Sequence, residues 1–165
     1  MNNFPVFSVR DDILASVLVA ERFVTKEQVA LAKKERLGII NTLLKNKVIT
    51  TMNLAQALSK NFECKLINLE KFDIPVEVLA TVPHGSAWCY QTVPVRIEDG
   101  VITLAMVDPA DFDSIDTLAH LLNLWDINIE VAPADQIEAL LERYYASGKE
   151  RGLSQRSIID YQRQP

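Results

Sequence analysis

The chain has 165 residues, of which 48% are hydrophobic and 24% charged, a composition that excludes an intrinsically disordered protein. No apolar run approaches the about 18 residues that span a bilayer, and no signal-peptide pattern begins the chain. We therefore expect a cytoplasmic protein without direct membrane insertion. The net charge of −5 divides into +4 for residues 1–62, −11 for residues 63–145 and +2 for residues 146–165. The acidic block argues against nucleic acid as a partner, and the change of sign predicts a boundary near residue 62.

The first part of the chain, residues 9–62, has apolar residues at intervals of three and four, the period of an α-helix. It also contains an internal repeat, because residues 13–32 align with residues 38–57 at an offset of 25. Thr25 and Thr50 occupy equivalent positions, and each is suited to cap the second helix of its copy. The repeat predicts two helical hairpins that pack together as a four-helix module.

A short link joins the two helices of each copy and carries a hydrophobic residue at the same repeat position. These residues are Phe23 in the first copy and Val48 in the second. A hydrophobic residue ahead of a capping residue commonly packs against the helix that follows. We therefore expect Phe23 and Val48 to hold the links against the core.

The strongest pattern in the second part of the chain predicts a β-hairpin. Two segments rich in β-branched residues, Val93–Glu98 and Val101–Met106, flank the pair Asp99-Gly100. An Asp-Gly pair is typical of a two-residue hairpin turn, because both of its residues tolerate a positive φ. A further strand is needed to cover this unit, and Ile127–Val131 has the pattern of one.

An acidic cluster follows the hairpin at the predicted start of a helix. Its members are Asp108, Asp111, Asp113 and Asp116. The cluster lacks the glycine and the terminal glutamate of a calcium-binding loop, and helix capping together with placement at a helix N-terminus accounts for three of the four. We therefore predict no metal site here.

The remaining elements are short. We expect a strand at Lys65–Leu69, helical turns that open at Pro75 and Pro83, and a last helix that starts at Pro133 or Ala134. The fold class is thus predicted as α+β. A helical module at 9–62 precedes a small domain at 63–145, whose sheet has three or four strands packed with helices, and residues 146–165 form a flexible tail or linker.

Three segments, in order along the chain, resemble the N-terminal domain of the type II secretion and type IV pilus assembly ATPases, the GspE, PilB and MshE group. These segments are INLEKFDIPVEVLATVP, VPVRIEDGVITLAMVDPADFDSIDTL and INIEVAPADQIEALLERYY. The helical repeat is similar to the module that precedes this domain in the same family. The resemblance implies a non-catalytic region that docks the attached ATPase motor onto the cytoplasmic domain of an inner-membrane platform protein.

The resemblance also implies a second possibility, which is binding of cyclic di-GMP. Binding members begin each copy with Arg-Leu-Gly at a fixed distance before the threonine, because arginine pairs with phosphate or stacks on guanine and glycine lets the backbone approach. Registered on Thr25, the first copy has Ile13, Leu14 and Ala15 at these positions. Registered on Thr50, the second copy has Gly38, Ile39 and Ile40.

A degenerate motif, Arg36-Leu37-Gly38, stands two residues too early in the second copy. Its use would require a rotation of the helix by about 200°, at roughly 100° per residue. The family's glutamine near the end of each copy is also missing, because Arg36 and Asn61 stand at its places. Two arginine-glycine pairs are needed to clamp the ligand, so we expect cyclic di-GMP binding to be lost and no cofactor to be bound. Sensing of cyclic di-GMP stays open as the alternative function.

No pattern for catalysis is present in the sequence. A GxxxxGK[ST] phosphate loop is missing, so this chain cannot itself hydrolyse ATP as the family's motor does. His84 is expected at a helix start, and His120 on a helix surface or partly buried. Cys64 and Cys89 lack metal-ligand spacing and are expected to be buried free thiols. The two tryptophans, Trp88 and Trp125, are expected to anchor a core or an interface.

Overall fold

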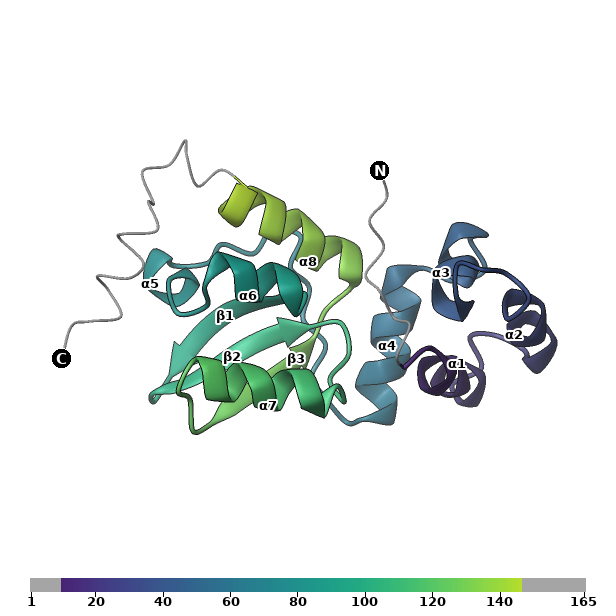
Figure 1. The fold of residues 1–165 in the computed structure, drawn as a ribbon, viewed down its shortest axis with the longest axis horizontal. Helices are drawn as coiled ribbons and strands as arrows, with labels where there is room; N and C mark the ends of the chain where they lie inside the picture. The colour runs from purple at the N-terminus through teal and green to yellow at the C-terminus, as the bar shows by residue number, and fades with distance from the viewer. Residues whose placement is uncertain (1–9, 147–165) are drawn as a thin grey trace.

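The computed structural model describes residues 10–146, and its helical module lies at one end of the molecule (Figure 1). This module consists of α1 (Asp11–Ala20), α2 (Lys26–Ala32), α3 (Ile39–Lys45) and α4 (Thr51–Asn61). The other end is a three-stranded sheet with α6 and α8 above it and α7 below it in the same view. The predicted α+β class and four-helix module are confirmed.

The two copies of the repeat share their local hydrogen bonds. Thr25 and Thr50 each form a capping box, with Gln28 in the first copy and Asn53 in the second. The links are also equivalent, because the backbone N–H groups of Phe23 and Val48 donate at 2.9 Å to carbonyls five residues earlier in each copy. The prediction that these threonines cap the second helix of each copy is therefore confirmed.

The prediction for the links is confirmed for one of the two residues. Phe23 is partly buried and packs against the core, whereas Val48 has 37% of its surface exposed. The residues that fill the core are the next ones along the chain, Val24 and Ile49, which are 5% and 3% exposed. In each link a residue with positive φ, Arg22 or Lys47, stands two positions before the residue that fills the core.

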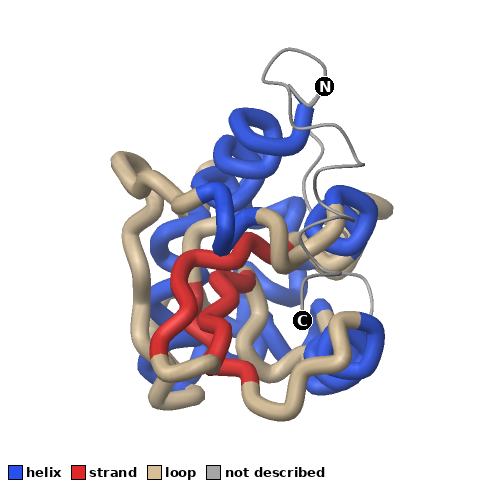
Figure 2. Tube along the Cα trace, turned by 90° about the vertical axis from the view of Figure 1, so that its left-hand side faces the viewer, coloured by secondary structure: helices blue, strands red, loops and turns tan. Residues whose placement is uncertain are grey.

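The sheet contains β1 (Thr92–Glu98), β2 (Val101–Met106) and β3 (Ile127–Val131), in that order. β1 and β2 are antiparallel and joined by the predicted Asp99-Gly100 turn, in which both residues have positive φ. β3 pairs with β2 in parallel, so β2 is the central strand. Figure 2 looks onto this end of the molecule and shows the strands enclosed by helices.

The strand expected at Lys65–Leu69 does not form. In its place, Leu66 makes an isolated bridge to Val131, with two backbone hydrogen bonds of 2.9 Å that involve Lys65 and Ile67. The pairing stops there because Val131 is the last residue of β3. The N–H group of Leu69 donates instead to the side chain of Gln136 in α8, at 2.8 Å.

The remaining helices cover the sheet. They are α5 (Val76–Leu79), α6 (His84–Cys89), α7 (Phe112–Leu121) and α8 (Ala134–Leu141), and the π-helix η1 (Glu142–Ala146) continues α8. Pro75, Pro83 and Pro133 each stand directly before a helix, as the sequence predicts. None of the helices within residues 10–146 is long and apolar enough to cross a membrane.

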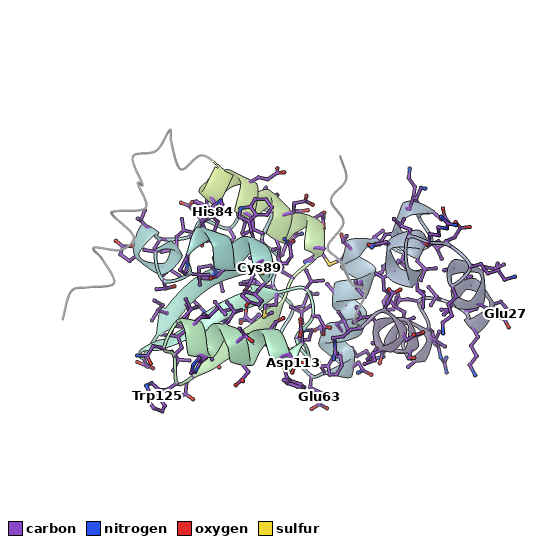
Figure 3. The ribbon with its side chains drawn as sticks, in the orientation of Figure 1. Glu27, Glu63, His84, Cys89, Asp113 and Trp125 are labelled. Carbon is purple, nitrogen blue, oxygen red and sulfur yellow. The ribbon has the colours of Figure 1, made fainter. Side chains whose placement is uncertain are left out.

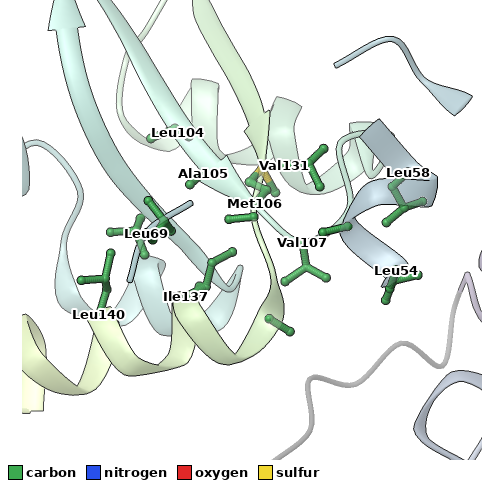
Figure 4. Close-up of a cluster of buried hydrophobic side chains, with 14 of the residues drawn as sticks. Leu54, Leu58, Leu69, Leu104, Ala105, Met106, Val107, Val131, Ile137 and Leu140 are labelled. Carbon is green, nitrogen blue, oxygen red and sulfur yellow. The ribbon is translucent and has the colours of Figure 1, made fainter. Parts of the chain in front are cut away.

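The buried hydrophobic side chains form one cluster that extends from the helical module into the sheet. Helix α4 makes this connection because it contacts both α8 and β3. Figure 4 shows its residues Leu54 and Leu58, at most 1% exposed, beside Val107 at the end of the sheet. The module boundaries 9–62 and 63–145 stay predictions, and the predicted tail lies outside the described residues from position 147 on.

Candidate functional site

The degenerate motif lies in the connection between the two repeat copies. Arg36 and Leu37 are exposed, and Gly38 directly precedes α3. The backbone of Gly38 has φ +92° and ψ 160°, a region that is essentially restricted to glycine. The glycine is therefore required by the backbone itself.

The N-terminus of α3 is capped by a side chain from the other copy. The carboxylate of Asp11, in the first turn of α1, accepts hydrogen bonds from the N–H groups of Ile39 and Ile40, the latter at 2.9 Å. A Cβ atom at Gly38 would lie 3.1 Å from Oδ2 of Asp11, so the glycine also leaves room for this carboxylate. Asp11 thus ties the start of one copy to the start of the other.

This arrangement has a chemical consequence for anion binding. The free N–H groups and the dipole at a helix N-terminus favour a negative charge, which here is supplied by the protein. A phosphate at the same place would meet the carboxylate of Asp11 and would have to displace it. The role of Asp11 could not be predicted from the sequence. A glycine before a helix has no side chain to cap it, so another residue must accept the free N–H groups, and that residue, Asp11, stands 28 positions before Ile39.

The acidic cluster is divided among different structural roles. Asp108 pairs with Arg10 at 2.5 Å and so joins the sheet to the beginning of α1. Asp111 accepts a hydrogen bond of 3.3 Å from the N–H group of Ser114 and caps α7, as expected. Asp113 and Asp116 are exposed on α7. Within residues 10–146, no three His, Cys, Asp or Glu side chains are grouped so that they could hold a metal ion.

A partly buried ion pair crosses the sheet. The guanidinium of Arg96 on β1 donates to both carboxylate oxygens of Glu130 on β3, and Glu130 is only 4% exposed. The ammonium of Lys65 lies 3.5 Å from the same carboxylate. The hydrogen bonds to Glu130 raise the pKa of Arg96 above its usual value. The carboxylate of Glu130 is buried, whereas the side chain of Arg96 is 29% exposed, and the pair joins β1 to β3 across β2.

Two tyrosines anchor the end of the described chain. The hydroxyl of Tyr144 donates to Asp73 at 2.6 Å, and the hydroxyl of Tyr145 lies 3.1 Å from the carbonyl oxygen of Val82. Burial raises the pKa of Tyr145, so this residue stays neutral. Its ring packs edge-on against His84, with 5.8 Å between ring centroids, and this position at the start of α6 agrees with the prediction for the histidine.

The other residues considered from the sequence do not assemble into a site. Cys64 and Cys89 are free thiols, but Cys64 is half-buried and Cys89 exposed, so the expectation of burial is wrong. Partial burial raises the pKa of the Cys64 thiol. His120 is exposed near the end of α7. Trp125 is 94% exposed in the loop after α7 and does not belong to the core.

The comparison with protein families gives a match over most of the sheet-containing part. A model described as the MshEN domain matches residues 62–151, which is more than half of the chain. The chain belongs to the MshEN domain family. The resemblance to the N-terminal domains of the secretion and pilus ATPases is thereby confirmed.

Among curated proteins, the type IV pilus assembly ATPase PilB of Myxococcus xanthus is 31% identical over 152 residues, which covers 88% of this chain and 26% of PilB. Bacteriophage adsorption protein B of Escherichia coli K12 is 24% identical over 149 residues, covering 88% of this chain and 20% of that protein. The chain therefore spans 26% or less of the length of these relatives.

Two solved structures share the fold. The structure of MshE with cdg, a complex with cyclic di-GMP, has a TM-score of 0.65 and 23% identity, covering 80% of this chain and 98% of that one. The N-terminal domain of XpsE has a TM-score of 0.68 and 19% identity, covering 82% of this chain and 96% of that one. The match is to an N-terminal domain and not to the catalytic ATPase domain.

Proposed function

We propose that this MshEN chain is the non-catalytic docking and regulatory N-terminal region of a type II secretion or type IV pilus assembly ATPase. It binds the cytoplasmic domain of an inner-membrane platform protein and thereby holds a covalently attached motor at the membrane. In this proposal the protein is cytoplasmic and peripheral to the inner membrane through its partner. The observation that carries the proposal is the match to PilB along 88% of this chain.

The proposed mechanism is positioning. The helical module provides the gripping surface, and the residues after Tyr145 let the motor move relative to it. Exposed hydrophobic side chains on this module support the assignment, since such residues anchor protein interfaces. Among them are Ile13 on α1, 49% exposed, and Val48 in the link before α4, 37% exposed.

Titration calorimetry of the 165-residue chain with the cytoplasmic domain of its cognate platform protein tests the proposal. We expect saturable binding that a double substitution, Ile13→Glu with Val48→Glu, weakens about tenfold or more, because charged side chains would enter an apolar interface. A matched control, Leu121→Ser on α7, should bind like the original chain. Absence of binding by the original chain would reject the docking role.

The presence of an attached motor can be tested on the gene alone. We expect the coding sequence after codon 165 to continue into a segment with a GxxxxGK[ST] phosphate loop. A stop codon directly after Pro165 would contradict the proposed ATPase and would favour a free-standing protein.

Sensing of cyclic di-GMP is the second candidate, and the observation that supports it is the ligand of the MshE structure. We expect the melting temperature of this chain to be unchanged by the ligand, because Asp11 occupies the N-terminus of α3 and no arginine-glycine pair is in register. A rise in melting temperature would support sensing. Loss of that rise in Arg36→Ala, but not in Lys34→Ala, would assign it to the degenerate motif.

A further inference from the structure

The outward face of α7 and the loop after it form an acidic and apolar surface, here called the α7 face. Its large hydrophobic members are Phe112, Leu121 and Trp125, which are 71%, 59% and 94% exposed. Residues Asp113, Asp116, Thr117 and His120 lie exposed between the first two, at the helical spacing of one face. Phe112 and Leu121 stand nine positions apart and border this polar face at opposite edges, and Trp125 extends it into the loop, so exposed hydrophobic and acidic side chains alternate across one surface.

The charge around the α7 face restricts what can cover it. Between Arg96 and Arg143 the chain has no lysine or arginine, but it has eleven aspartates and glutamates. The face carries the exposed carboxylates of Asp113, Asp116 and Asp126, with no basic side chain from this stretch to balance them. A partner must therefore bring positive charge together with apolar side chains, because like charges across an interface are unfavourable.

The helical module of the same chain has a segment with this chemistry, here called the basic segment, Leu31–Leu37. Leu31 and Leu37, at its two ends, are 64% and 46% exposed. Between them the exposed side chains of Lys33, Lys34 and Arg36 outnumber Glu35, although Lys33 also pairs with Asp12 at 2.6 Å. Lys34 and Arg36 are thus the cations best placed to meet an acidic surface.

The two surfaces cannot meet within one molecule. In Figure 3, Trp125 is labelled at the left end of the described structure and Glu27, on α2 beside the basic segment, at the right end. Figure 1 shows the same separation, with helices α4 and α1 between α7 and α2. A contact between them must therefore join two copies of the chain.

We propose that the α7 face of one copy binds the basic segment of a second copy, so that the chain associates head to tail. Trp125 and Leu121 of one copy make the apolar contact with the two leucines of the basic segment in the other copy. The aspartates of the α7 face pair with Lys34 and Arg36 and so fix the relative position of the two surfaces. Such an interface is heterologous, which leaves both terminal copies with one open surface and permits further growth or ring closure. This inference does not depend on the platform partner.

Sedimentation velocity of the 165-residue chain over about 10 μM to 1 mM, where small interfaces associate, tests the inference. We expect the weight-average mass to rise with protein concentration. This rise should become smaller as the salt concentration increases from about 50 to about 500 mM, because salt screens the attraction between exposed charges. A chain that stays monomeric over the whole range would overturn the inference.

Charge reversals identify the surfaces. Lys34→Glu with Arg36→Glu, and separately Asp113→Lys with Asp116→Lys, should each reduce association about tenfold or more, because two surfaces of like charge then face each other. Matched controls reverse exposed charges elsewhere, Lys45→Glu with Lys47→Glu and Glu70→Lys with Glu77→Lys. Circular dichroism of every variant verifies that the fold is retained.

The decisive variant carries both charge reversals in one chain. The glutamates introduced at positions 34 and 36 of one copy then face the lysines introduced at positions 113 and 116 of the next copy. We expect it to regain most of the association lost by each reversal alone. Failure to regain it, or an equal loss in the control variants, would overturn the head-to-tail contact. Trp125→Ser should weaken association without changing its salt dependence, because the substitution removes apolar contact and no charge. An unchanged affinity would show that the α7 face is not part of the interface.

Discussion

The helical module contains short-range polar contacts that repeat in both copies, beside the long-range cap of α3 by Asp11, whereas the sheet is held by long-range polar contacts. In the helical module the capping bonds of Thr25 and Thr50 join residues three apart. In the sheet the contact between Arg96 and Glu130 spans 34 residues, and that between Tyr145 and Val82 spans 63. Local contacts recur wherever the sequence recurs, whereas long-range contacts depend on the completed fold. The predictions below test this difference.

The largest effect is expected at the junction between the two parts. Leu58→Ala on α4 removes a fully buried side chain and should lower the free energy of unfolding by about 3 kcal/mol. Both tryptophans lie in the sheet part, so their fluorescence reports on it alone, while circular dichroism also reports on the helical module. We expect the two urea transitions to coincide and to shift together.

A control for this prediction is Leu18→Ala, which truncates a buried side chain of α1 in the helical module. If the shared hydrophobic cluster makes the chain one cooperative unit, this substitution should also move the fluorescence transition. Two separate transitions would show that the modules unfold independently.

The second effect concerns the sheet. Arg96→Met should lower the free energy of unfolding by about 2–3 kcal/mol, because the buried carboxylate of Glu130 loses its main partner. Lys65→Met is the matched control and should cost less than about 1 kcal/mol, since the side chain of Lys65 is 70% exposed. Equal costs in urea denaturation would contradict the leading role of Arg96.

The third effect compares two glycines with positive φ. Gly38→Ala should cost about 2–3 kcal/mol, because its φ and ψ suit only glycine and the new Cβ atom would lie 3.1 Å from Asp11. Gly100→Ala should cost about 1 kcal/mol, since a Cβ atom there meets nothing within 4 Å. Thermal unfolding measures both, and a smaller cost at Gly38 would argue against the cap by Asp11.

The smallest effect tests the equivalence of the two repeat copies. Thr25→Ala and Thr50→Ala should each cost about 1 kcal/mol, because each removes the same capping acceptor. The costs should add in the double variant, since the two capping boxes share no partner. Clearly unequal costs would show that the copies are alike in sequence but not in energetics.

The sequence by itself determined the parts of the fold that local chemistry controls. The repeat offset, the two threonine caps, the Asp99-Gly100 turn and the prolines before helices were predicted correctly, because each depends on residues within a few positions. Neighbouring residues also suggested the strand at Lys65–Leu69, and there the prediction failed. The partner strand β3 ends at Val131, opposite Leu66, and the N–H group of Leu69 is satisfied by the side chain of Gln136, far away in the chain.

Only the tertiary structure decided how the candidate site is filled. The sequence placed Arg36, Leu37 and Gly38 out of register, but it could not show that Asp11 caps α3, because their proximity arises from the packing of α1 against α3. In the same way, it could not show that Trp125 and Leu121 are left uncovered while Leu118 of the same helix is buried. Periodicity identifies an apolar face, but only packing determines which apolar residues remain available to a partner.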